Sequence, residues 1–167
     1  LAGLLEAGLP AISLAADGAV MSAISNDIGP GAIFAQQVMA LGFAGDVLLC
    51  ISTSGESENV INAAITAKAK GMAVIGLMGP DTSTLSKYCD VSLLAQGRST
   101  AQIQSAHQVL YHDLCKDLEA WLIDGAGQRA ESKYGTSSAE FRTDKSLMGE
   151  STKWRAWFRS SLPACHI

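Results

Sequence analysis

A group of hydroxyl residues directly follows residues 46–51, the run that most clearly predicts a buried strand. The hydroxyl residues are Ser52, Thr53, Ser54 and Ser57. The apolar run predicts a buried strand, and helical periodicity begins at Asn59. A strand, a turn and a helix in succession place backbone N–H groups and the positive end of a helix dipole at one edge of a sheet. The spacing therefore predicts a phosphate-binding turn, in which Gly55 lets the backbone approach a ligand closely.

Helix capping is the alternative explanation of the same turn. Thr53 and Glu56 have the spacing of a capping box, but a cap uses one hydroxyl and this turn offers four. The turn is not a nucleotide P-loop, because it contains no lysine and no Gly-Lys-Ser/Thr follows. Phosphate binding is the favoured interpretation, and capping stays open.

The elements that must position this turn follow from alternating apolar and amphipathic segments between residues 9 and 124. We expect strands at 10–14, 46–51, 72–78 and 91–94. We expect helices at 19–24, 32–41, 59–69 and about 101–123, and a brief helix that reaches Lys87. The strands are almost continuously apolar, which predicts an α/β fold whose parallel sheet is flanked by helices on both faces. Residues 47–51 should form a central strand of that sheet.

Composition limits the partners and the location. The 167 residues carry a formal charge of -4 and a pI near 5.3, which argues against general binding to nucleic acid or to an anionic membrane surface. No apolar run reaches the length of about 18 to 20 residues that a spanning helix needs, and the first residues lack a basic flank. Four cysteines without a C-x-x-C pair indicate free thiols: Cys50, Cys89, Cys115 and Cys165. We expect a cytoplasmic protein.

The composition changes at Gly125. Residues 1–124 contain 5 basic and 12 acidic residues, a balance of -7, whereas residues 125–167 contain 7 and 4, a balance of +3. We expect one domain over 1–124 and a polar, poorly ordered extension over 125–167. The basic and aromatic segment 153–159 could bind nucleic acid by stacking, which is the less favoured interpretation.

The strings at 45–64 and 70–79 resemble the sugar isomerase (SIS) domain. More narrowly, they resemble phosphoheptose isomerases, which convert sedoheptulose 7-phosphate to D-glycero-D-manno-heptose 7-phosphate. Further similar segments lie at 9–14, 23–27, 34–42 and 102–107, and at His112. The resemblance implies the SIS-type three-layer sandwich, which is flavodoxin-like or Rossmann-like, and a sugar phosphate as the ligand.

The resemblance also assigns roles to residues. Ser52, Thr53, Ser54 and Ser57 match the family's phosphate-binding hydroxyls, and Asp27 matches a polar residue of the sugar pocket. Gln104 and His112 match active-site residues, which are metal ligands in members that bind zinc. His112 would be the catalytic histidine. Eight residues of helix amount to about 800°, so Gln104 and His112 lie roughly 80° apart on one face. His107 is left between a site role and a structural role.

The sequence also departs from the family pattern. The family's glutamate base and a further histidine belong to a region before the first strand, and this chain starts after that region. Ala101 and Gln102 replace an acidic residue and an arginine of the family. Family members form sites between subunits of a homotetramer, so we expect a homo-oligomer, and we expect impaired isomerase activity in this chain.

Two other functions stay open. One is a non-catalytic SIS module that senses a phosphosugar or binds a protein, as in the related replication-initiator-associating protein. The other is an amino-sugar isomerase or a deacetylating relative, because the phosphate-binding turn is shared. Release of ammonia from an amino-sugar phosphate would identify an amino-sugar isomerase.

Overall fold

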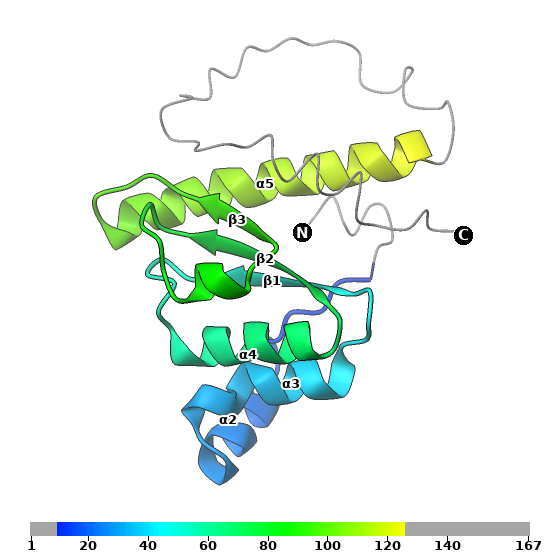
Figure 1. Ribbon diagram of the computed structural model, residues 1–167, viewed down its shortest axis with the longest axis vertical. Helices are drawn as coiled ribbons and strands as arrows, with labels where there is room; N and C mark the ends of the chain where they lie inside the picture. The colour runs from blue at the N-terminus through cyan, green and yellow to red at the C-terminus, as the bar shows by residue number, and fades with distance from the viewer. Residues whose placement is uncertain (1–9, 126–167) are drawn as a thin grey trace.

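The computed structural model describes the backbone of residues 10–125 and the side chains of residues 10–119 (Figure 1). The expected extension over 125–167 lies outside these residues except for Gly125, where the last helix ends. The helices are α2 (Gly18–Asp27), η1 (Pro30–Ala32), α3 (Ile33–Leu41), α4 (Glu58–Ala69), η2 (Leu85–Tyr88) and α5 (Thr100–Gly125). The strands are β1 (Val47–Ile51), β2 (Ala73–Met78) and β3 (Val91–Leu94). All but one of the predicted elements are present, with boundaries shifted by a few residues at most.

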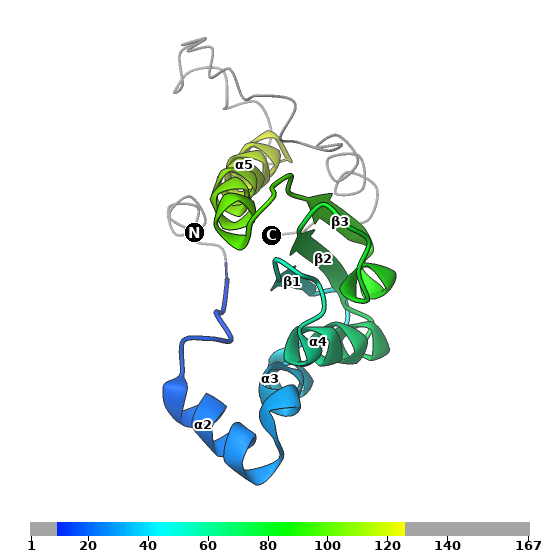
Figure 2. The ribbon, with the colours of Figure 1, turned by 90° about the vertical axis from the view of Figure 1, so that its left-hand side faces the viewer.

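The three strands form a parallel sheet in the order β1-β2-β3. In its register, Cys50 of β1 is opposite Gly76 of β2, and Gly76 is opposite Ser92 of β3. The view along the sheet shows α3 and α4 on one side and α5 on the other (Figure 2). The predicted α/β class, a parallel sheet with helices on both faces, is confirmed.

Strand β2 supplies both halves of the core, because successive side chains of a strand point to opposite faces. Val74 and Met78 are buried in the cluster formed with α3 and α4. Ile75 and Leu77 are buried in the second cluster, against α5. An unbroken apolar sequence in β2 therefore means burial on both faces.

The central position predicted for residues 47–51 is wrong for the described sheet. β2 is the central strand, and β1 lies at an edge. The strand expected at 10–14 does not form, since those residues are irregular or in a turn and pair with no strand. No described element covers the face of β1 that carries Val47, Leu49 and Ile51, and these side chains are 37%, 39% and 51% exposed. The apolar pattern of β1 correctly predicted a strand, but it did not determine which neighbours that strand has.

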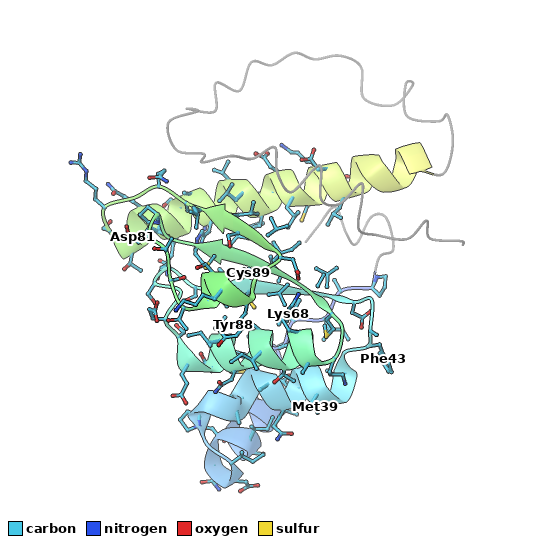
Figure 3. The ribbon with its side chains drawn as sticks, in the orientation of Figure 1. Met39, Phe43, Lys68, Asp81, Tyr88 and Cys89 are labelled. Atoms are coloured by element: carbon cyan, nitrogen blue, oxygen red, sulfur yellow. The ribbon has the colours of Figure 1, made fainter. Side chains whose placement is uncertain are left out.

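The connections around the sheet are held by polar contacts. The Lys68 Nζ of α4 (Figure 3) lies 2.6 Å from the Asp90 Oδ1, and the Val74 N–H donates to the other carboxylate oxygen of Asp90 at 2.8 Å. Partial burial raises the pKa of Asp90, but these two interactions outweigh it and leave the pKa below its ordinary value. The pair thus joins α4 to the segment that leads into β3.

Buried cysteines are packed on the α4 side of the sheet. Cys50 of β1 is buried and Cys89 (Figure 3) is half-buried, and neither is in a disulfide, as expected. Burial raises the pKa of Cys50 to about 12, with a further contribution from Cys89, and burial raises the pKa of Cys89 to about 11. Both side chains are packing groups in the thiol form at neutral pH.

Among residues 10–125, no helix is long and apolar enough to cross a membrane.

Candidate functional site

The hydroxyl-rich turn is held by its own first residue. The Ser52 N–H continues the sheet by donating to the Leu77 carbonyl at 3.0 Å. The buried Ser52 Oγ accepts from the Gly55 N–H at 3.1 Å and lies 3.2 Å from the Ser57 Oγ. Gly55 has a φ of 65°, which lets the chain reverse without steric cost from a Cβ. Ser52 therefore shapes the turn, while Ser54 and Ser57 are exposed to solvent.

Capping does not explain the hydroxyl residues. Helix α4 begins at Glu58 with Ser57 as its N-cap residue, and no side chain caps it. The capping box between Thr53 and Glu56, which was the alternative explanation of the turn, therefore does not form. The Glu56 carboxylate instead accepts the Thr84 N–H at 2.7 Å, and this bond, together with Lys87 nearby, lowers the pKa of Glu56.

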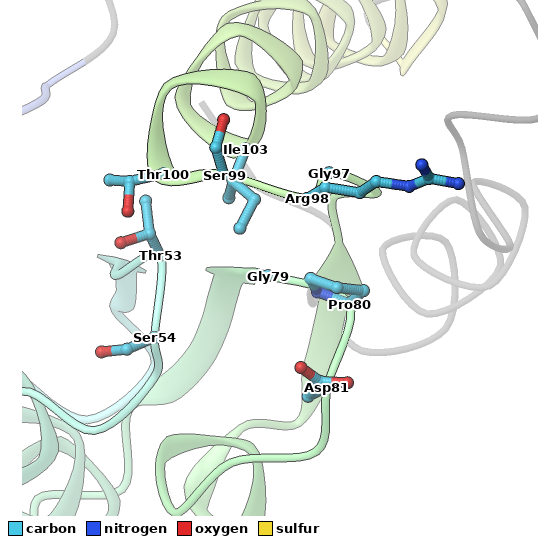
Figure 4. Close-up of a pocket in the computed structure, with 10 residues that line it drawn as sticks. All are labelled: Thr53, Ser54, Gly79, Pro80, Asp81, Gly97, Arg98, Ser99, Thr100 and Ile103. Atoms are coloured by element: carbon cyan, nitrogen blue, oxygen red, sulfur yellow. The ribbon is translucent and has the colours of Figure 1, made fainter.

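An open cavity of about 370 Å³ lies beside this turn, where the carboxyl ends of all three strands meet (Figure 4). Each strand sends its following loop to the cavity: residues 53–54 after β1, 79–81 after β2 and 97–99 after β3. Helix α5 adds its first residue, Thr100, and Ile103. This edge of a parallel sheet is where α/β proteins bind ligands, and the start of a long helix favours an anion there.

The lining of the cavity is polar and carries both signs of charge. It contains the hydroxyls of Thr53, Ser54, Ser99 and Thr100, together with one carboxylate and one guanidinium. In Figure 4, Thr53 and Ser54 lie on one side, Pro80 and Asp81 lie on the other, and the Arg98 side chain extends away from the two turn residues. Such a lining suits a hydroxylated ligand with an anionic group.

Sequence reasoning missed the second half of this lining. Asp81 and the segment 97–100 were not predicted as site residues, although both follow expected strands. The available signal was the topology itself, because loops that follow parallel strands meet at the same edge of the sheet. Gly79 and Gly97 are a second signal, because a glycine in such a loop indicates close packing. A Cβ at Gly79 would lie 2.5 Å from the Thr53 carbonyl oxygen, and one at Gly97 would lie 2.9 Å from Ile103.

The structure divides the predicted phosphate-binding hydroxyls into two groups. Thr53 and Ser54 line the cavity. Ser52 and Ser57 are not among the lining residues and contact one another behind the turn. The turn thus presents two of its four hydroxyls to the cavity and uses the others to hold its shape.

The predicted residues of α5 do not line the cavity. Gln104 and His112 are both exposed, and the His112 ring lies beside Tyr111 with ring centroids 4.6 Å apart. His107 is different, since it is buried with its Nε2 3.1 Å from the Met78 carbonyl oxygen. His107 therefore joins α5 to the end of β2. Of a site role and a structural role, its position supports the structural role.

Asp27 lies far from this cavity in the fold. It is the last residue of α2, is exposed, and accepts a hydrogen bond from the Asn26 side chain at 3.2 Å. In both ribbon views α2 lies beyond α3 and α4, on the opposite side of the sheet from α5 (Figures 1 and 2). The structure of one chain therefore does not bring Asp27 together with the cavity or with α5.

The described residues do not make a complete zinc site. Structural and catalytic zinc ions take three or four protein ligands, mostly cysteine, histidine and carboxylate. Residues 10–119 contain no group of three or more such side chains placed to hold a metal. Gln104 and His112 offer one amide and one imidazole, so the residues present do not fit a zinc site by themselves.

Comparison with known proteins supports the class of fold. Residues 1–79 match the model of the family described as "SIS domain". The solved structure of phosphoheptose isomerase GmhA from Neisseria gonorrhoeae is similar, with a TM-score of 0.68, 40% identity, and coverage of 71% of this chain and 66% of that chain. A phosphoheptose isomerase structure from Francisella tularensis gives a TM-score of 0.63 at 40% identity, over 65% of this chain and 58% of the other. The α/β fold of this chain is that of the SIS domain family.

The chain is similar to phosphoheptose isomerases, as predicted. It is 40% identical to the phosphoheptose isomerase of Sulfurimonas denitrificans over 111 residues, which is 66% of this chain and 57% of the relative. It is 45% identical to that of Nitratiruptor sp. over 107 residues, which is 64% of this chain and 57% of the relative. The chain thus spans less than two thirds of the length of these relatives.

Proposed function

We propose that this chain contributes the phosphate-binding part of a cytoplasmic phosphosugar isomerase that converts sedoheptulose 7-phosphate to D-glycero-D-manno-heptose 7-phosphate. One observation carries the proposal: a hydroxyl-lined cavity at the carboxyl ends of the strands, in a chain 40% and 45% identical to two phosphoheptose isomerases. The chain spans 57% of each of those relatives.

The chemistry requires a fixed substrate and a proton transfer. An aldose–ketose isomerase removes a proton from one carbon and returns a proton to its neighbour through an enediol, with a positioned acid and base. Thr53 and Ser54 would hold the phosphate, and binding energy from this remote group would fix the carbon chain. His112 is the candidate acid or base, since an imidazole can both accept and donate a proton.

A homotetramer is part of the proposal. Gln104, His112 and Asp27 are exposed and lie apart from the cavity of their own chain. If the site were completed between subunits, these residues could contact a ligand bound in the cavity of a neighbouring subunit. No step is assigned to zinc, because the residues present do not supply its ligands.

Binding of phosphate tests the first half of the proposal. Replacing Thr53 and Ser54, the two turn hydroxyls that line the cavity, together with alanine should weaken binding of sedoheptulose 7-phosphate and of inorganic phosphate by about 1 to 3 kcal/mol, because charge-assisted hydrogen bonds are lost. Titration calorimetry on the parent, this double variant and Ser22→Ala, an exposed serine of α2, measures the effect. Equal affinity in the parent and the double variant would exclude this turn as the phosphate site.

Turnover tests the second half. His112→Ala should leave phosphate binding unchanged and abolish isomerisation in a protein extended to the full length of its relatives. Binding without turnover in that extended protein would instead support a non-catalytic SIS module. Ammonia release from an amino-sugar phosphate would support the amino-sugar isomerase.

A further inference from the structure

The phosphate-binding turn rests against a second loop, residues 79–85. The Gly79 N–H donates to the Thr53 carbonyl at 3.0 Å, and the Leu85 N–H donates to the Gly55 carbonyl, also at 3.0 Å. A third bond runs from the Thr84 N–H to the Glu56 Oε1 at 2.7 Å. The first two bonds join backbone to backbone, so no side-chain substitution removes them directly. The third depends on one side chain, that of Glu56.

Glu56 is also linked to a residue that lines the cavity. Its backbone N–H donates to the Ser54 Oγ at 3.2 Å, so the place of Glu56 affects the direction of the Ser54 hydroxyl. The two contacts of Glu56 therefore form a continuous connection from the loop at Thr84 to the cavity wall at Ser54.

The electrostatic effect of this carboxylate opposes its structural effect. Glu56 is exposed and negatively charged, and it lies two residues from Ser54, so its charge alone disfavours a phosphate dianion. A carboxylate at this position can favour anion binding only by holding the turn residues in place. A ligand binds more tightly to a site whose groups are already ordered, because less freedom is lost on binding.

We propose that Glu56 is a positioning residue, whose carboxylate ties the phosphate-binding turn to the Thr84 backbone so that Thr53 and Ser54 keep their places in the wall of the cavity. This inference rests on the proposed function, since it assigns the turn to the phosphate. It also assigns a purpose to the part of the second loop at Thr84 and Leu85, which braces the turn beside the cavity.

Two substitutions at Glu56 distinguish the effect of side-chain length from the effect of charge. Glu56→Gln keeps an oxygen at the same reach and removes the charge, whereas Glu56→Asp keeps the charge and shortens the side chain by one methylene. Because the bond to Thr84 is at 2.7 Å, the shorter side chain cannot make it without moving the turn. A positioning role predicts that Glu56→Gln binds inorganic phosphate as tightly as the parent or more tightly, and that Glu56→Asp binds about tenfold more weakly. A role through charge alone predicts instead that Glu56→Gln binds phosphate more tightly than the parent and that Glu56→Asp, which keeps the charge, binds like the parent.

The measurement is titration calorimetry of the full chain with inorganic phosphate and with sedoheptulose 7-phosphate. Both ligands should lose affinity by the same factor in Glu56→Asp, because the defect lies at the phosphate end. Glu58→Gln is the matched control, since it removes an exposed charge two residues away that no bond ties to the second loop. The thermal midpoints of all variants should agree, which shows that the change in affinity does not come from unfolding.

The outcomes distinguish this inference from the function on which it rests. If the parent binds phosphate, Ser54→Ala weakens that binding, and Glu56→Asp binds like the parent, the positioning role is wrong and the phosphate site stands. If the parent binds neither ligand, the proposed function fails, and the positioning role fails with it.

Discussion

Replacing Gly55 with alanine tests whether the turn is as closely packed as the structure indicates. A Cβ on Gly55 would lie 2.0 Å from the Ser83 Oγ and 2.4 Å from the Ser83 Cβ. Ser83 is buried, with its hydroxyl 3.2 Å from the Met78 sulfur, so it has little room to move. The φ of 65° adds strain for any residue with a Cβ.

The two effects have separate magnitudes. The left-handed backbone costs an alanine roughly 1 to 2 kcal/mol. Overpacking against a well-ordered side chain costs roughly another 1 to 3 kcal/mol. Gly55→Ala should therefore lower the free energy of unfolding by about 2 to 5 kcal/mol. It should also weaken phosphate binding, because the shift that relieves the overlap moves Ser54.

The assay is urea unfolding followed by circular dichroism, with Gly71→Ala as the control. Gly71 has a similar φ of 74°, but its Cβ would meet the nearest atom, the Ala44 Cβ, at 3.4 Å, an ordinary contact. Gly71→Ala should show the backbone cost alone, about 1 to 2 kcal/mol. Adding Ser83→Gly to Gly55→Ala should recover part of the loss. If Gly55→Ala costs no more than Gly71→Ala, the close packing of turn and loop is refuted.

Three further predictions concern the core, the thiols and the ion pair. Leu77→Ala in the fully buried central strand should cost about 2 to 5 kcal/mol, whereas Leu49→Ala on the open face of β1 should cost under about 1 kcal/mol, both measured by urea unfolding. Cys50 and Cys89, with pKa values of about 12 and 11, should resist iodoacetamide at pH 8 in the native chain and react after unfolding, as peptide mapping would show; rapid native labelling would contradict their burial. Asp90→Ala should destabilise the chain by about 1 kcal/mol near pH 7. The folded-state pKa of Asp90 lies below its ordinary value of 3.8. The contribution of Asp90 to stability is therefore present above pH 3.8 and is lost as the pH falls through the folded-state pKa. Urea unfolding at several pH values would detect this loss.

The sequence predicted the elements well because their signals are local. The buried strand at 91–94 has the bounds that its apolar run indicated, and α5 ends within two residues of its expected end. Strand order is not local. The run at 10–14 resembles a strand in composition, yet nothing in its own residues determines whether a partner strand is present, and in the described structure it pairs with none.

The candidate site was predicted in part for the same reason. The turn at 52–57 could be found because strand, glycine, hydroxyls and helix are consecutive in sequence. The residues that complete the cavity, such as Asp81 and Arg98, come from two other loops, and only the fold brings them near Thr53. The place of Glu56 opposite Thr84, across 28 residues, also follows from packing and not from spacing.

The edge position of β1 affects how the molecule behaves when it is concentrated. Natural edge strands discourage other strands from adding to them by means of lysine, proline or a bulge, and Val47–Ile51 contains no lysine and no proline. Within residues 10–125, its outer edge is open and its apolar side chains are partly exposed. These five residues are uncharged and rich in β-branched and large apolar groups, the composition that promotes stacking into intermolecular sheets. The strand that leads into the turn is thus also an open edge that favours aggregation, and a lysine introduced at Leu49 would oppose that process through charge repulsion.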